Sequence, residues 1–288
     1  MQVLLYYKYV DVPDAEAETL RHRELAQKLQ LKGRILISSE GLNGTCSGTA
    51  ENIEAYKNAL NEHPLFGGIS FKESQSDDHV FDKLFVRTRP EVVTLRQEVS
   101  AKDAAPYITP NKLHAALEAG EDLVLIDMRN DYEAAVGRFS NAVTLSMQNF
   151  RDLPQFLRDL EPYKKSRVVT YCTGGIRCER ASGLLLKNGF TDVHQLEGGI
   201  VRYCEAYPDG YFHGSLFVFD KRMCVRFPGK QPPTYVATCT ICSTPCDRCA
   251  DCRDTTCHDL YVCCADCEKE RQGYCNKHQV PVRETVGV

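Results

Sequence analysis

The chain has 288 residues, a formal charge of −4 and a charged fraction of 26%, an ordinary balance for a globular protein of two or three domains. This charge excludes a protein that holds a polyanion by bulk positive charge, so a nucleic-acid substrate would need a local patch and specific contacts. No apolar run approaches the roughly 20 residues that span a bilayer, and the early acidic residues predict no signal peptide. We therefore expect a cytoplasmic protein with no membrane partner.

Residues 1–95 predict a ferredoxin-like α+β domain with the order β-α-β-β-α-β. VLLYYKYV is a strand, and apolar residues at helical spacing follow Pro13, with Gly33 after the predicted helix. RILIS is the next strand, and SEGLNGTCSG is a glycine-rich turn into a third strand. A helix over 50–61 and the strands GISFKES and KLFVRTR complete the domain.

Two features of this domain leave alternatives open. GLNGT, from Gly41 to Thr45, is either a tight turn or a substrate contact. Arg87 and Arg89 either touch phosphates or lie on a solvated strand face.

Residues 109–210 alternate between strands and helices, which predicts a doubly wound parallel α/β sheet with helices on both faces. The expected strands are DLVLID, RVVTY and VHQL, and the expected helices are FRDLPQFLRDL, CERASGLLLKN and GGIVRYCE. Ligands of such sheets bind beyond the carboxyl ends of the strands. Cys172 lies at such an end.

Residues 211–234 predict a β-hairpin, LFVFDKRMCVRF, that turns near Asp220 and Lys221, followed by the linker PGKQPP. Residues 235–288 form a cysteine-rich segment with too few large apolar side chains to build a core unaided. We expect this segment to be a metal-binding domain.

The loop after RVVTY carries the strongest chemical signal. In CTGGIR, a strand ends at Cys172, and the backbone N–H groups of the following residues and a helix N-terminus point at one centre. The residues predicted to surround a bound substrate there are Thr173, Gly174, Gly175 and Ile176. With Arg177 nearby, the loop predicts a lowered thiol pKa and an exposed, reactive thiolate, the alternative being a buried structural cysteine.

The spacing of Cys172 and Arg177 is C-x4-R, one residue shorter than the C-x5-R of cysteine-dependent phosphatases. The tighter loop suits one sulfur or oxygen atom better than a phosphate and disfavours a phosphatase. Cys178 lies in the first turn of the helix, where it either resolves an oxidised Cys172 as a disulfide or serves as a small packing residue.

Ten of the 15 cysteines lie between Cys239 and Cys275. This density, in a chain without secretory features, predicts metal ligands rather than disulfides. The most economical set is eight ligands for two structural zinc ions: Cys239, Cys242, Cys252, Cys257, Cys264, Cys267, Cys275 and His278. Cys246, Cys249 and Cys263 are then surplus or alternates. The spacing leaves open which ligands share an ion, and an iron–sulfur cluster is the alternative.

The stretch from Leu123 to Glu205 resembles a rhodanese domain, through LVLIDMRNDYE, VGRFSNAVTLSMQNF, YCTGGIRCE and GFTDVHQLEGGI. Asp127 and Arg129 match its DxR signature, which is mainly scaffold in such domains. CTGGIRCE, GRILISSEGLNGT, VFDKR and the tail cysteines together resemble, more narrowly, the rhodanese-type tRNA uridine hydroxylases. The likeness covers nearly the whole chain.

This resemblance implies a monooxygenase-type tRNA modification enzyme that uses molecular oxygen to convert the wobble uridine to 5-hydroxyuridine. It implies the tRNA anticodon loop as partner, Cys172 as the active cysteine and Cys178 as the second motif cysteine; the electron donor stays unknown. Cys172 either adds to C6 of uracil, or is oxidised first and carries oxygen or sulfur. The alternative functions are a thiosulfate or persulfide sulfurtransferase and a non-catalytic zinc-bearing RNA- or protein-binding module.

Overall fold

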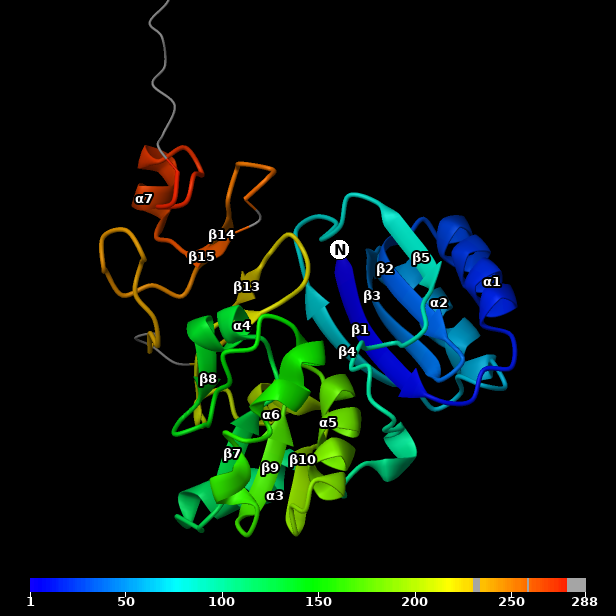
Figure 1. Cartoon of the computed structure of the whole chain (residues 1–288). Coiled ribbons are helices and arrows are strands. Elements are labelled where there is room, and N and C mark those ends of the chain that lie inside the picture. The colour runs from blue at the N-terminus through cyan, green and yellow to red at the C-terminus, as the bar shows by residue number, and fades with distance from the viewer. Residues whose placement is uncertain (230–233, 258, 279–288) are drawn as a thin grey trace, which may run out of the picture.

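The chain builds, in order, a five-stranded sheet with two helices, a four-stranded parallel sheet and a cysteine-rich segment (Figure 1). The computed structural model describes residues 1–229, 234–257 and 259–278. Most of the predicted linker PGKQPP, at 230–233, lies outside the described residues. The end of the predicted cysteine-rich domain, 279–288, also lies outside them.

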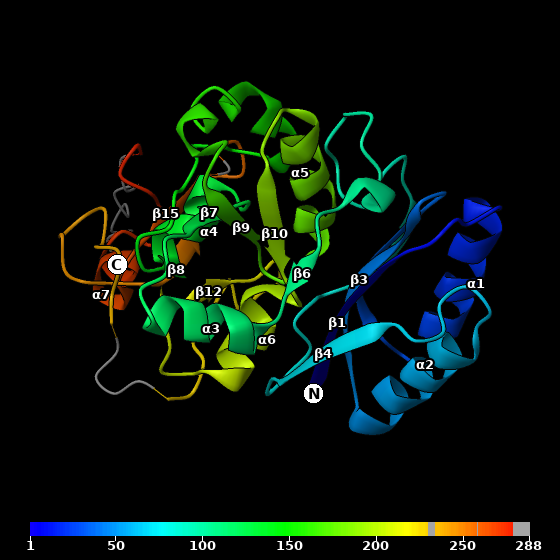
Figure 2. The ribbon, with the colours of Figure 1, turned by 90° about the horizontal axis from the view of Figure 1, so that it is seen from below.

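The N-terminal sheet has the strand order β4-β1-β3-β2-β5, with β5 parallel to β2. Its elements are β1 (Gln2–Tyr9), α1 (Ala15–Lys28), β2 (Lys32–Ser38), β3 (Gly41–Gly48), α2 (Ala50–Glu62), β4 (Ser70–Gln75) and β5 (Leu84–Thr88). Both helices cover one face (Figure 2), where Leu4, Tyr6 and Ile35 are buried in the core. The predicted ferredoxin-like fold is confirmed, with β5 as an added edge strand.

GLNGT is not a turn, because β3 begins at Gly41 and the chain reverses before it. Gly44 faces the helix-covered core, where a Cβ would lie 2.4 Å from the Tyr6 hydroxyl, so the strand needs glycine there. Gly33 does not follow the first helix but lies inside β2, and Gln30 takes the left-handed conformation after α1, with φ of 52°. In the sequence, the glycines at these positions suggest turns, but they lie within strands, where close packing leaves no room for a side chain.

The alternation of β3 turns Asn43 and Thr45 to the face that α1 and α2 leave uncovered. Cross-strand pairing on that face forms two rows, one of Lys72, Leu5, Thr45 and Arg34, and one of Ser70, Tyr7, Asn43 and Leu36. We call these two rows the open face of the sheet.

The central sheet has the order β6-β10-β9-β7 with every pair parallel, which confirms the predicted doubly wound fold. Its elements are β6 (Tyr107–Ile108), α3 (Pro110–Glu118), β7 (Val124–Asp127), α4 (Asp131–Val136), β8 (Gly137–Phe139), β9 (Arg167–Tyr171), α5 (Ile176–Lys187), β10 (Asp192–Leu196) and α6 (Gly199–Ala206). Helix α5 packs on one face, and α3 and α6 pack on the other.

The predicted helix FRDLPQFLRDL is instead a 3-10 segment, Phe150–Phe156, that contains Pro154. Proline lacks the N–H of an α-helical hydrogen bond, and its ring clashes with the preceding turn. Phe150 and Leu153 are still buried in the core, so the apolar pattern predicted the buried residues correctly but not the backbone conformation.

The predicted hairpin forms between β12 (Leu216–Phe217) and β13 (Cys224–Val225), after β11 (Phe212–Gly214), which pairs with β8. The cysteine-rich segment contains β14 (Cys249–Asp251), β15 (Leu260–Val262) and α7 (Ala265–Glu270). It packs in one cluster with Val136 of α4 and Phe217 of β12. In the described parts of the chain, no helix has the length and apolarity needed to cross a membrane.

Candidate active site

The loop between β9 and α5 wraps around the sulfur of Cys172. The N–H of Gly175 donates to Sγ over 3.2 Å, and Gly175 takes a φ of 106°, which favours glycine. The first turn of α6 holds the backbone of the loop in place, since Ile200 and Val201 donate their N–H groups to the carbonyls of Cys172 and Thr173. Gly174 has no positive φ; its lack of a side chain makes room for Leu5, which a Cβ would meet at 3.3 Å.

The pKa of Cys172 is lowered to about 5, although burial by itself raises it. A side-chain hydrogen bond from Cys178, the charge of Arg177 and the N–H groups of Arg177 and Gly175 together outweigh burial. Burial and the contact with Cys172 raise the pKa of Cys178 well above its usual value. The pair is therefore a thiolate and a thiol at neutral pH.

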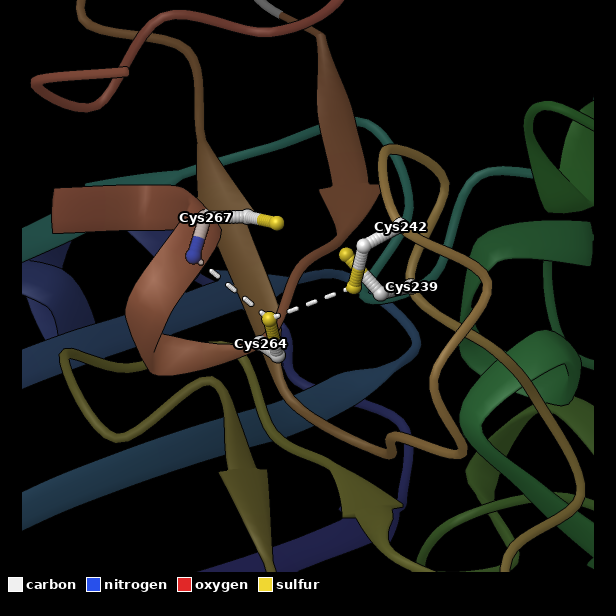
Figure 3. Close-up of side chains that lie close together, drawn as sticks. All are labelled: Cys239, Cys242, Cys264 and Cys267. Carbon is white, nitrogen blue, oxygen red and sulfur yellow. Dashed lines mark hydrogen bonds between the residues drawn. The ribbon is translucent and has the colours of Figure 1, made fainter. Parts of the chain in front are cut away.

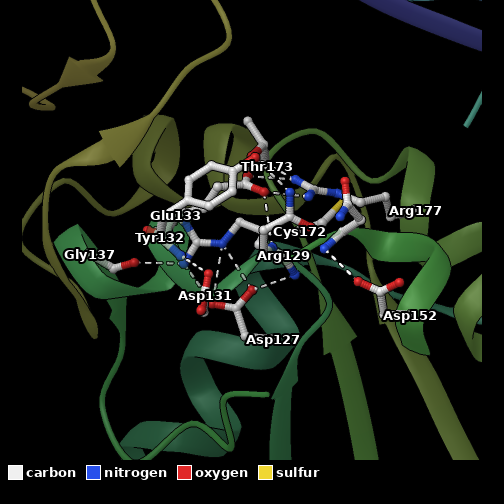
Figure 4. Close-up of polar contacts among 12 residues, drawn as sticks. Asp127, Arg129, Asp131, Tyr132, Glu133, Gly137, Asp152, Cys172, Thr173 and Arg177 are labelled. Atoms are coloured by element: carbon white, nitrogen blue, oxygen red, sulfur yellow. Dashed lines mark hydrogen bonds and ion pairs between the residues drawn. The ribbon is translucent and has the colours of Figure 1, made fainter. Parts of the chain in front are cut away.

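Arg177 makes a bidentate ion pair with Glu133 of α4, with N–O distances of 2.6 and 2.8 Å (Figure 4). Glu133 is fully buried and Arg177 is 7% exposed. The guanidinium also donates to the hydroxyl of Thr173 over 3.3 Å. Glu133 was not predicted from the sequence. Its only signal there is that it is a carboxylate shortly after the DxR signature.

Asp127 and Arg129 hold α4 in place, as expected for scaffold residues. Arg129 is fully buried and pairs with Asp127 at an N–O distance of 2.6 Å (Figure 4). It also donates hydrogen bonds to the backbone carbonyls of Glu133 in α4 and of Gly137, which follows α4. The position of the Glu133 carboxylate therefore depends on this inner ion pair.

Cys172 is fully buried, which corrects the expectation of an exposed thiol. The cause is the N-terminal sheet, whose open face lies over the loop. Leu5 packs against Gly174, and the Tyr7 hydroxyl lies 2.7 Å from the place of a Cβ on Gly175. This cover comes from a different domain, and no pattern in the sequence of the Cys172 loop indicates it.

Cys172 nevertheless forms part of the wall of a cavity of about 350 Å³ between the two sheets. The loop contributes Thr173, Gly174, Ile176 and Arg177, and the open face contributes Leu5, Tyr7, Arg34, Leu36, Asn43 and Thr45. The remaining wall residues include Phe81, Asn130, Asn149, Phe150, Arg151 and Phe219. Of the four residues predicted to surround the substrate, Thr173, Gly174 and Ile176 line this cavity, and Gly175 does not.

Motifs far apart in the sequence therefore meet at one place. GLNGT supplies Asn43 and Thr45, and VFDKR supplies Phe219, whose ring is 57% exposed and lies 5.9 Å from the guanidinium of Arg177. Arg87 and Arg89 do not line the cavity; both are exposed, and Arg87 lies over the Phe85 ring.

Glu179 and Arg180, which follow Cys178, connect α5 to the N-terminal sheet and to the segment between the two domains. Glu179 accepts hydrogen bonds from Tyr7 of β1 over 3.1 Å and from Tyr107. Arg180 donates to the carbonyls of Gln97 and Val99 over 2.9 Å, in the segment that joins the domains. The residues after Arg177 thus hold the cover over Cys172.

The eight predicted metal ligands assemble into two groups of four, within which the ligand atoms lie within 4.8 Å of one another. One group is Cys239, Cys242, Cys264 and Cys267 (Figure 3), and the other is Cys252, Cys257, Cys275 and His278. The first and third pairs along the chain share one group, and the second and fourth share the other. Cys246, Cys249 and Cys263 belong to neither group.

The donor sets fit a tetrahedral metal ion. Zinc–sulfur bonds of about 2.3 Å in a tetrahedron place the sulfurs roughly 3.8 Å apart. The sulfurs of Cys242 and Cys264 lie 3.7 Å apart, and those of Cys257 and Cys275 lie 3.8 Å apart. Both groups can therefore hold a metal ion of this size.

Comparison with known proteins agrees with this architecture. Family models match a UPF0176 acylphosphatase-like domain at residues 1–92, a rhodanese-like domain at 109–206 and a rhodanase C-terminal region at 213–278. The solved rhodanese-like domain of an Anabaena sp. protein is 23% identical, covers 38% of this chain and 80% of its own, and superposes with a TM-score of 0.33. By the family-model matches, the chain carries a rhodanese-like domain with a further matched region on each side.

Two curated relatives are both named tRNA uridine(34) hydroxylase. The protein of Cytophaga hutchinsonii is 40% identical over 278 residues, 96% of this chain and 88% of its own length. That of Bacillus mycoides is 40% identical over 281 residues, with the same coverage. The chain belongs to the family of these proteins.

Removing the Cys178 thiol is expected to raise the pKa of Cys172, because that thiol donates the hydrogen bond that most lowers it. Iodoacetamide labelling of the Cys172 peptide, measured by mass spectrometry over a pH series, should give a midpoint near 5 in the unmodified protein. C178A should shift the midpoint upward, whereas C178S keeps a hydroxyl donor and should shift it less. Equal midpoints in all three proteins would contradict this assignment.

Proposed function

We propose that this chain hydroxylates C5 of the wobble uridine of tRNA with molecular oxygen, and that Cys172 is the catalytic residue. The observation that carries the proposal is a stabilised thiolate in the wall of a cavity that residues of GLNGT, CTGGIR and VFDKR line together. The names of the relatives, at 40% identity over most of the chain, support the same reaction.

The thiolate has a direct chemical use. C5 of uracil is a poor nucleophile until a nucleophile adds at C6 and pushes electron density into the ring as an enolate. We propose that the Cys172 sulfur makes this addition and that C5 then reacts with O2; one oxygen atom stays on C5, and the other leaves as water after a reductant has supplied two electrons and two protons. Elimination of the C5 proton and the sulfur restores the aromatic ring and the thiolate.

Arg177 and Glu133 act as positioning residues in this scheme. Their buried ion pair fixes the guanidinium beside the loop, so the thiolate keeps a neighbouring positive charge. Asn130 also lines the cavity, and its Oδ1 has no hydrogen-bond partner among the described residues. This oxygen is suited to accept the N3–H of uracil.

The surroundings of the cavity suit a single-stranded RNA loop. Arg34 and Arg151 are exposed at its walls, and the Phe219 ring stands half in solvent beside them. Bases splayed out of an anticodon loop stack on aromatic rings, and arginines contact the adjacent phosphates. We propose that the wobble base enters the cavity while its neighbours stay on this rim.

We further propose that the two cysteine groups hold two structural zinc ions. Such ions supply cross-links that replace an apolar core. The segment that they fold packs against α4, where the Tyr132 ring meets Phe217 at 5.2 Å. Because α4 also carries Glu133, folding of the cysteine-rich segment supports the position of Arg177.

Replacing Cys172 by serine should abolish 5-hydroxyuridine formation while tRNA binding persists, since the hydroxyl is not ionised at neutral pH. Nucleoside mass spectrometry of tRNA from cells that carry only the C172S protein measures this directly. An unchanged 5-hydroxyuridine pool would contradict the proposal, and sulfur transfer from thiosulfate would then become the leading function.

The C6 addition predicts a covalent complex with tRNA that contains 5-fluorouridine at the wobble position, because fluorine at C5 resists elimination. A denaturing gel should show this adduct with the unmodified protein and none with C172S. Activity without an adduct would favour the rival in which Cys172 is oxidised first.

Removing the rim charge should weaken tRNA binding and its dependence on salt. R34A is expected to reduce the slope of log affinity against log salt concentration by about one, because one phosphate contact is lost. R167A is the matched control: Arg167 begins β9, whose other end carries the loop. Equal effects of both variants would place the RNA elsewhere.

Metal analysis should find two zinc ions per chain, and single serine substitutions should remove them separately. C264S is expected to lose one ion and C257S the other, because each cysteine belongs to a different group. C263S is the control, since Cys263 is adjacent to a ligand and outside both groups. Loss of an ion in C263S, or iron in place of zinc, would overturn the assignment.

A further inference from the structure

We propose that Cys172 and Cys178 together supply the two electrons that the hydroxylation consumes, so that each turnover ends in a Cys172–Cys178 disulfide that an external thiol must reduce. This inference rests on the proposed function and adds the source of its electrons. It makes Cys178 a reductant rather than only a hydrogen-bond donor.

The positions of the two sulfurs support this role. Both side chains are fully buried in the same core cluster, and Gly175 lies between them in the chain and donates its N–H to the Cys172 sulfur over 3.2 Å. The loop between them is held tightly, since the N–H of Cys178 donates to the carbonyl of Gly175 over 3.0 Å. The buried cysteines Cys46 and Cys204 lie in other core clusters, so neither is a comparable partner.

The protonation states suit the two stages of the reaction. Cys172 is the thiolate that adds to the base, and Cys178 stays a thiol that retains its proton until oxygen has reacted. Burial is the largest cause of the raised Cys178 pKa, and the contact with the Cys172 thiolate, which adds to it, is lost once Cys172 is bonded to C6. Cys178 then ionises and attacks the outer oxygen of the peroxide that O2 forms on C5, so that the O–O bond breaks and Cys178 becomes a sulfenic acid. The Cys172 thiolate that is eliminated from C6 attacks this sulfur, and the S–O bond breaks to give the disulfide and water.

The stoichiometry closes without another redox partner in the chemical step. Uridine, O2 and two thiols give 5-hydroxyuridine, one water and one disulfide. The O–O bond and the C5–H bond break, while a C5–O bond and an S–S bond form. One oxygen atom stays on the base, and the other leaves as water with the two protons that the thiols and C5 release in excess.

The cavity decides how the disulfide is reopened. Cys172 is among the residues that line the cavity and Cys178 is not, so we expect an external thiolate that enters the cavity to attack the disulfide at Cys172. Its attack forms a mixed disulfide and releases Cys178, and a second thiol completes the reduction. Because the base occupies the same cavity, reduction follows product release. The required partner is a thiol reductant small or extended enough to enter a cavity of about 350 Å³.

The test is a single-turnover experiment with the full-length, zinc-loaded protein. The reduced protein is freed of thiol without air, mixed with excess tRNA, and then exposed to O2 with catalase present. We expect one 5-hydroxyuridine per chain and no more, with a Cys172–Cys178 disulfide in the peptide mass spectrum. Added dithiothreitol should restart turnover.

The variants separate this inference from a structural role of Cys178. C178A should give almost no product without added thiol but regain part of its activity with dithiothreitol, whereas C204S should match the unmodified protein at every stage. Repeated turnover without any thiol, or one product per chain with both cysteines still reduced, would overturn the inference. Absence of 5-hydroxyuridine even with O2 and dithiothreitol would instead overturn the proposed function.

Discussion

A negative charge on a fully buried sulfur is the constraint on which the site depends. Burial penalises the Cys172 thiolate, and only nearby donors and a fixed cation keep it ionised. Three residues after Cys172 contribute to this: Gly175 donates its N–H, Arg177 brings charge and a backbone N–H, and Cys178 donates from the first helical turn. Loss of any of these contributions is expected to raise the pKa of the buried sulfur.

The same constraint explains why three domains are joined so closely. Arg177 needs a buried counterion, so Glu133 and the helix that carries it must be placed with accuracy. Arg129 fixes that helix from inside the rhodanese-like domain, and the cysteine-rich segment packs on it from outside. The N-terminal sheet then seals the loop, with Glu179 and Arg180 as its anchors. Parts remote from the sulfur thereby decide its charge.

The cover also changes what the thiolate can react with. A rhodanese-like loop that opens to solvent meets any small electrophile, but here Leu5 and Tyr7 close it and leave one cavity with polar and aromatic walls. In the proposed function, this cavity receives a flat base from the RNA bound at its rim.

The sequence by itself determined the strand–loop–helix around Cys172, the parallel sheet and the eight metal-ligand positions, because these follow from local spacing and periodicity. It left GLNGT open between a turn and a substrate contact, and the structure rules out the turn; it also predicted FRDLPQFLRDL to be an α-helix, which is wrong. Glycine and apolar spacing do not reveal cross-strand packing or the effect of Pro154. Only the tertiary structure decided that Glu133 neutralises Arg177, which ligands share a metal group, and that a second domain buries Cys172. These depend on sheet register and domain docking, which bring together residues that no local pattern connects.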